Sequence, residues 1–138
     1  MPSYSPFQLT VKYCSYYLFA ANGKGHGAHS PFVYDFIRNV LNDKKDLDVY
    51  RKIESLRKRL LRSDALAEVE DFGAGATTRP ALRSVASIAA RSAKSPKLAQ
   101  LLFRITRYYR SRYIIELGAS LGISTAYLAS ADPHSVVV

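Results

Sequence analysis

The run from Tyr113 to Ala129, YIIELGASLGISTAYLA, is the stretch that most constrains the fold. It opens with a short apolar segment led by two isoleucines, which is typical of a buried parallel strand, and Gly118 ends that pattern. From Ile123 apolar residues recur at helical spacing, with Ser120 or Ser124 placed to cap the first turn. The run predicts a strand, a glycine turn and a helix, the unit at which α/β proteins bind nucleotide-like ligands.

Two cofactor motifs compete for this turn. The dinucleotide fingerprint requires glycines at its first, third and sixth positions, which are Gly118, Ser120 and Ile123 here, so only the first position fits. The spacing that is present is Glu-x-Gly-x-x-x-Gly, from Glu116 to Gly122. A purely structural strand-to-helix turn in another kind of α/β protein stays open as the alternative.

The close run Glu-Leu-Gly-Ala-Ser-Leu-Gly-Ile-Ser-Thr resembles motif I of class I methyltransferases that use S-adenosyl-L-methionine, and is most similar to their small-molecule O-methyltransferase branch. In that family the glycine turn wraps the methionine and ribose part of the cofactor, and the acid approaches the amino end of the methionine. The resemblance implies methyl transfer to a small-molecule substrate, with the catalytic residues unknown. It implies a cofactor-binding edge made of Glu116, Gly118, Ala119, Ser120 and Gly122.

The resemblance divides the chain into a helical N-terminal region, residues 1–111, and the first β-α-β portion of a Rossmann-like methyltransferase domain, residues 112–138. The family places an acid for the ribose hydroxyls after the second strand, about 20 residues beyond the first glycine. That count from Gly118 reaches the last residue, Val138. We therefore expect an α/β fold with a truncated sheet, which binds the cofactor weakly or not at all, does not catalyse alone and self-associates through unpaired strands.

Composition sets further bounds. A chain of 138 residues with 48% hydrophobic residues can form one domain with a real core. The single cysteine, Cys14, excludes an internal disulfide and a cysteine-rich zinc site, which suits a reducing cytoplasm. The run from Phe7 to Ala21 contains Lys12 and several tyrosines and is too short and too polar for a membrane span. We expect a cytoplasmic protein with no membrane partner.

The formal net charge of +9 raises the question of nucleic-acid binding. Most of the excess lies between Lys44 and Arg112, interleaved with apolar positions as on solvated amphipathic helices. No recognisable RNA-binding or helix-turn-helix signature accompanies it. Nucleic-acid binding is therefore disfavoured, and the alternative to the enzyme is a basic helical binding or assembly module without catalysis.

Five helices are predicted before Arg112, and Ser30-Pro31 and Ser95-Pro96 have the form of helix starts. The predicted helices are 7–21, 31–41, 46–62, 80–91 and 97–109. The inner positions of the third are Val49, Ile53, Leu56, Leu60 and Leu61. Its outward basic residues are Arg51, Lys52, Arg57, Lys58, Arg59 and Arg62. The inner positions of the fifth are Leu98, Leu101, Leu102, Ile105 and Tyr109.

His26 and His29 stand in a glycine-rich loop, and no carboxylate or cysteine beside them completes a metal site. Contact with substrate or cofactor and plain loop packing stay open for them. The surrounding residues 24–37, KGHGAHSPFVYDFI, resemble the leader of the methyltransferase domain in a bacterial group common in Bacteroidetes.

A second glycine segment, residues 69–76, imitates the cofactor motif because Asp71 lies two residues before Gly73. Residues 65–70 contain two acids, which is poor material for a central parallel strand, so we predict a glycine loop that connects helices. The loop also recurs in the bacterial group, and a role as a wall of the cofactor pocket stays open.

Overall fold

The computed structural model describes residues 5–19, 30–69 and 81–138, and the chain divides into two compact units, residues 1–43 and 44–138. The first unit contains helix α1 (Pro6–Phe19) and helix α2 (Pro31–Phe36), which ends in a π-helical turn, η2 (Ile37–Leu41). Ser30 caps α2 as predicted, because its Oγ accepts a hydrogen bond from the N–H of Val33 at 3.5 Å. His26 and His29 lie outside the described residues.

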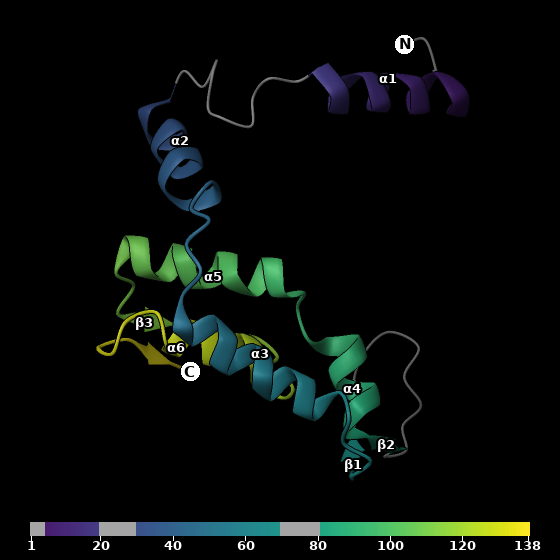
Figure 1. The fold of residues 1–138 in the computed structure, drawn as a ribbon, viewed down its shortest axis with the longest axis vertical. Coiled ribbons are helices and arrows are strands. Elements are labelled where there is room, and N and C mark those ends of the chain that lie inside the picture. Colours follow the sequence, from purple (N-terminus) through teal and green to yellow (C-terminus); the bar gives the residue numbers. More distant parts are fainter. Residues whose placement is uncertain (1–4, 20–29, 70–80) are drawn as a thin grey trace. The chain divides into compact units, whose positions relative to one another are not determined.

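The second unit is built around three helices that pack together, α3, α5 and α6 (Figure 1). Its elements are α3 (Asp48–Leu60), β1 (Leu66–Val69), β2 (Ala81–Ser84), α4 (Val85–Ser92), α5 (Pro96–Tyr109), β3 (Tyr113–Ile114), α6 (Ile123–Ala129) and β4 (Val136–Val137). The three helices supply the core residues Tyr50, Ile53, Ala99, Phe103, Ile123 and Tyr127. The ring of Tyr50 meets that of Phe103 edge-on, with 5.1 Å between centroids.

The strands β3 and β4 pair in parallel, as the sequence predicts, with Tyr113 opposite Val136 and α6 connecting them. The hydrogen-bonded ladder continues to Glu116, whose N–H donates to the carbonyl of Val138 at 2.8 Å. The described residues therefore form a mixture of helices and small sheets, compatible with the α/β class. A Rossmann-like sheet stays a prediction.

The other small sheet corrects two predictions. Residues 66–69 form strand β1 where a loop was expected, and residues 81–84 form strand β2 where a helix was expected to begin. The two strands pair antiparallel, and Glu68 is exposed to solvent. Acidic residues disfavour a central parallel strand, which is buried on both faces, but they are compatible with an antiparallel strand that has one solvated face. Helix α4 begins only after Ser84, whose Oγ accepts from the N–H of Ser87 at 3.2 Å. Residues 70–80, with Gly73, lie outside the described part.

The buried face of α5 differs from the predicted one. Its buried residues are Ala99, Phe103 and Thr106. Leu98 and Tyr109, which the periodicity placed inside, are exposed. The reason is that α6 packs against the face of α5 that carries Ala99 and Phe103. The leucine pattern of α5 does not by itself specify which of two adjacent faces contacts α6.

The orientation of α3 is also partly mispredicted. Arg57, expected on the outer face, is only 7% exposed, whereas Leu61, expected inside, is 42% exposed. Arg57 is buried because it pairs with Glu54, which also contacts α6. Helices α3 to α5 belong to the same compact unit as β3, α6 and β4. The functional boundary assigned at residues 111–112 stays a prediction.

Candidate ligand pocket at the glycine turn

In the turn between β3 and α6, two positions have a backbone conformation that only glycine adopts without strain. Gly118 and Gly122 have φ angles of +85° and +73°, and Ser120 between them has +49°. A side chain in the left-handed region costs about 1–2 kcal/mol. The N–H of Gly122 closes the turn by donating to the carbonyl of Ala119 at 2.9 Å. The two glycines of the sequence motif are therefore required by backbone conformation.

The helix cap predicted for this turn is wrong. Neither Ser120 nor Ser124 caps α6; Gly122 occupies the N-cap position, and no side chain there accepts from the first amides. The hydroxyl of Ser120 lies 2.7 Å from the hydroxyl of Ser92, at the end of α4. A serine with positive φ is uncommon, and Ser120 combines this conformation with the hydroxyl contact to Ser92. The turn is thus attached to α4 as well as to β3 and α6.

A pocket of about 410 Å³ lies at the carboxyl end of β3. Four of the five predicted cofactor residues line it: Glu116, Gly118, Ala119 and Ser120. Gly122 is outside the lining and forms the end of the turn. A Cβ built on Gly118 or Gly122 would meet no heavy atom of the described chain within 4 Å. A ligand can therefore approach the backbone closely at both glycines.

Glu116 is half-buried, and its Oε2 accepts a hydrogen bond from the hydroxyl of Thr125 in α6. The bond directs the carboxylate toward the start of that helix, where an amine is a suitable partner for its remaining acceptor positions. Sequence reasoning missed Thr125. The signal was available, since a polar residue in the first helical turn after a strand-ending acid can reach back to it.

Sequence reasoning also missed the pocket residues contributed by the connection between α4 and α5, which are Ser92, Ala93 and Lys94. This connection links two helices and has no periodic pattern of its own, so the sequence alone does not place it beside the glycine turn.

Helix α6 is held behind the pocket by a polar contact with α3. Tyr127 is fully buried, and its hydroxyl donates to Oε1 of Glu54 at 2.9 Å. Burial, and secondarily the carboxylate of Glu54, raises the pKa of Tyr127 to about 12. Arg57 Nε donates to both oxygens of Glu54, at 3.1 and 2.9 Å. Arg57 Nη2 is buried and has no hydrogen-bond partner among the described residues.

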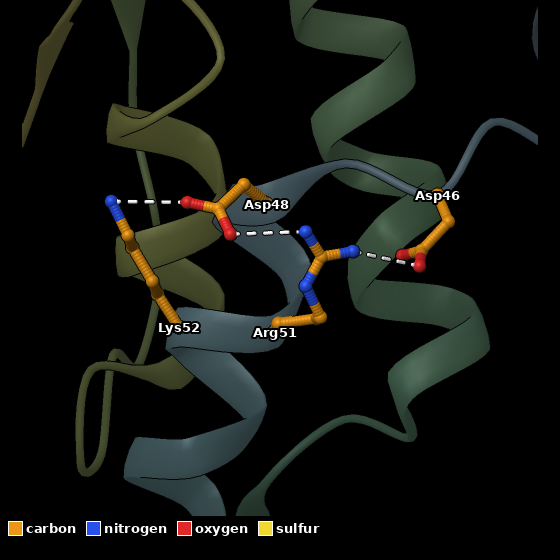
Figure 2. A network of polar contacts seen from close by, with 4 residues as sticks. All are labelled: Asp46, Asp48, Arg51 and Lys52. Carbon is orange, nitrogen blue, oxygen red and sulfur yellow. Dashed lines mark hydrogen bonds and ion pairs between the residues drawn. The ribbon is translucent and has the colours of Figure 1, made fainter.

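The basic residues near the start of α3 are matched by acids. Figure 2 shows Arg51 between Asp46 and Asp48, and Lys52 on the other side of Asp48. Arg51 lies 2.9 Å from Asp46 and 3.1 Å from Asp48, and Lys52 lies 3.1 Å from Asp48. Hydrogen bonds and charges from Lys52 and Arg51 lower the pKa of Asp48. This part of the positive charge is therefore compensated locally and does not form an open basic surface.

In the described part of the chain, no three histidine, cysteine, aspartate or glutamate side chains are grouped as metal ligands, and no helix is long and apolar enough to cross a membrane. Comparisons of the chain with family models, with curated proteins and with solved structures find no match. The function of the pocket is therefore inferred from its own residues.

Proposed function

We propose that the unit of residues 44–138 binds S-adenosyl-L-methionine at the glycine turn, as the cofactor-binding part of a class I methyltransferase that acts on a small-molecule acceptor, and that this chain does not catalyse alone. One observation carries the proposal. The parallel unit β3-α6-β4 opens a pocket at the carboxyl end of β3, and four of the motif residues line it. The crevice at the carboxyl ends of parallel strands is where open α/β sheets bind nucleotide-like ligands.

The residues of the pocket suit the methionine part of the cofactor. The carboxylate of Glu116 can accept hydrogen bonds from the amino group, and the space above Gly118 admits the ligand to the backbone. The cofactor supplies a methyl group on a positively charged sulfonium. The protein's contribution to transfer would be to hold acceptor and methyl in line.

We expect the affinity of this chain to be low. Among the described residues that line the pocket, Glu116 is the one acid, so no second carboxylate is placed for the ribose hydroxyls. A missing charged hydrogen bond weakens binding by about 1.5–3 kcal/mol, or one to two decades in Kd.

The test is ligand-observed NMR of S-adenosyl-L-methionine and S-adenosylhomocysteine with the 138-residue chain at millimolar ligand. We expect weak binding that Gly118→Val abolishes, because the added side chain occupies the open space at the turn. Gly73→Val, in the other glycine segment, should weaken binding less. Circular dichroism confirms that each variant is folded, and Gly118→Ala is the milder substitution at the same φ.

Two results would overturn the proposal. One is the absence of binding by the wild-type chain. The other is full binding by folded Gly118→Val and Gly118→Ala. Equal losses at Gly73 and Gly118 would show that the earlier glycine segment forms a true wall of the pocket.

A second candidate function, an assembly module, is favoured by the outer face of the β3–β4 sheet. Its apolar residues Tyr113, Ile115, Val136 and Val138 are exposed, and Leu117 beside them is 94% exposed. Parallel sheets are normally covered on both faces. We expect the chain to self-associate in light scattering as its concentration rises, and Ile115→Lys to reduce this. A wild-type chain that stays monomeric over the same range would exclude self-assembly through this face.

A further inference from the structure

The pocket at the glycine turn contains one acid and one base among the described residues that line it, Glu116 and Lys94. Lys94 forms no ion pair with any residue in the described ranges, unlike Arg51, Lys52 and Arg57 on α3. A pocket with one charge of each sign complements a ligand that carries both, because each ionic group of the ligand then finds an opposite charge.

The α4–α5 connection, which carries Lys94, is linked to the glycine turn by a contact between serine side chains. Ser92 Oγ donates its single proton to the carbonyl of Ile88 at 2.7 Å. In the 2.7 Å contact between Ser92 and Ser120, the donor is therefore Ser120. The end of α4 and the glycine turn are joined directly, and Lys94 follows two residues after the joint.

We propose that the Lys94 ammonium binds the carboxylate of an α-amino-acid group whose ammonium is held by Glu116. Lysine suits this role because its charge stands on a long flexible stem that reaches into the pocket while its backbone stays in the connection. The proposal rests on the proposed function, and it assigns the orientation of the methionine end of the cofactor: amine toward Glu116 and Thr125, carboxylate toward the α4–α5 connection.

The test compares two ligands that share the thioether nucleoside and differ in the amino-acid group. S-adenosylhomocysteine has the amine and the carboxylate, whereas 5′-methylthioadenosine has neither. Binding of both is measured for the wild-type chain, Lys94→Met, Lys94→Arg and the control Lys97→Met. Lys97 is exposed in the first turn of α5 and does not line the pocket.

We expect Lys94→Met to raise the Kd for S-adenosylhomocysteine about three- to tenfold, as for a charged contact at a partly open site, and to leave 5′-methylthioadenosine unchanged. Lys94→Arg should retain most of the affinity, and Lys97→Met all of it. Added salt should reduce the difference between wild type and Lys94→Met.

The possible failures are distinguishable. If the wild-type chain binds S-adenosylhomocysteine and Lys94→Met binds it equally, the role of Lys94 is wrong while the proposed function stands. An equal loss for both ligands in Lys94→Met would also exclude carboxylate recognition, because one ligand has no carboxylate. Absence of binding by the wild-type chain overturns both proposals.

Discussion

The two ends of α3 hold ion pairs of similar length in very different surroundings. Near its start, Arg51 and Asp46 lie 2.9 Å apart, with 62% and 71% of their side chains exposed (Figure 2). Near its end, Arg57 and Glu54 are also 2.9 Å apart, but their side chains are 9% and 21% exposed. Glu54 of this second pair also accepts a hydrogen bond from the hydroxyl of Tyr127, which belongs to the helix behind the ligand pocket.

The difference shows that the length of an ion pair does not set its contribution to stability. Water and salt screen the exposed pair, and ordering two long side chains offsets much of the attraction. The buried pair has lost most of its hydration, so removing one partner leaves the other charged group partly buried without compensation. A mutation at each end of one helix can therefore measure the effect of burial with the helix held constant.

The largest expected effect is on Arg57. Arg57→Ala should lower the free energy of unfolding by about 3 kcal/mol, because it leaves Glu54 without its cation in a partly buried site. The matched change Arg51→Ala should lower it by less than about 1 kcal/mol. Urea denaturation of both variants gives the comparison, and equal losses would show that the two ends of α3 are energetically alike.

The next effect concerns alkaline pH. The protonated hydroxyl of Tyr127 is favoured in the folded state, since its pKa is raised from 10.0 to about 12. The stabilisation is complete below pH 10 and decreases as the pH rises toward 12, by on the order of 2 kcal/mol. Urea denaturation of the wild type and of Tyr127→Phe across this range measures it.

Tyr127→Phe should be less stable than the wild type at neutral pH, because Glu54 loses a hydrogen bond. It should also lose less stability between pH 10 and 12, because the titrating group is gone. Parallel curves for the two proteins would mean that Tyr127 does not titrate differently in the folded and unfolded states.

The smallest effect belongs to the exposed network. The pKa of Asp48 lies below its ordinary 3.8 because of Lys52 and Arg51, so its ionised form stabilises the fold above that pH. This stabilisation is lost as the pH falls through the folded-state pKa. Asp48→Asn should give a shallower loss of stability in acid denaturation at low salt, and high salt should remove the difference. A difference that persists at high salt would contradict a screened surface contact.

Several features of the fold and of the candidate site could be predicted because they depend on local chemistry. Ser30-Pro31 starts a helix because the serine side chain accepts a hydrogen bond from a backbone N–H of the first turn, and the proline has no N–H that needs a partner. Both effects are local and hold wherever the helix lies. Likewise, the isoleucines before Gly118 and the positive φ at both glycines follow from short-range sterics. The parallel pairing of β3 with β4 follows from a strand, a helix and a strand in succession.

The errors arose where a residue's role depends on a distant neighbour. The acids near β1 argued against a central strand, but β2 pairs with it antiparallel and leaves Glu68 exposed. Lys94 lines the pocket because the fold places the α4–α5 connection beside the glycine turn. Neither contact leaves a periodic trace in the sequence.

The amino-acid sequence alone determined where the second unit turns: the glycines at 118 and 122 permit φ angles that other residues avoid, whatever packs around them. Tertiary structure alone decided which basic residue of α3 is buried. Arg51 and Arg57 are the same residue type on the same helix, and both read as outward. Arg57 differs because α6 places Tyr127 against Glu54, and desolvation depends on everything that surrounds a charge.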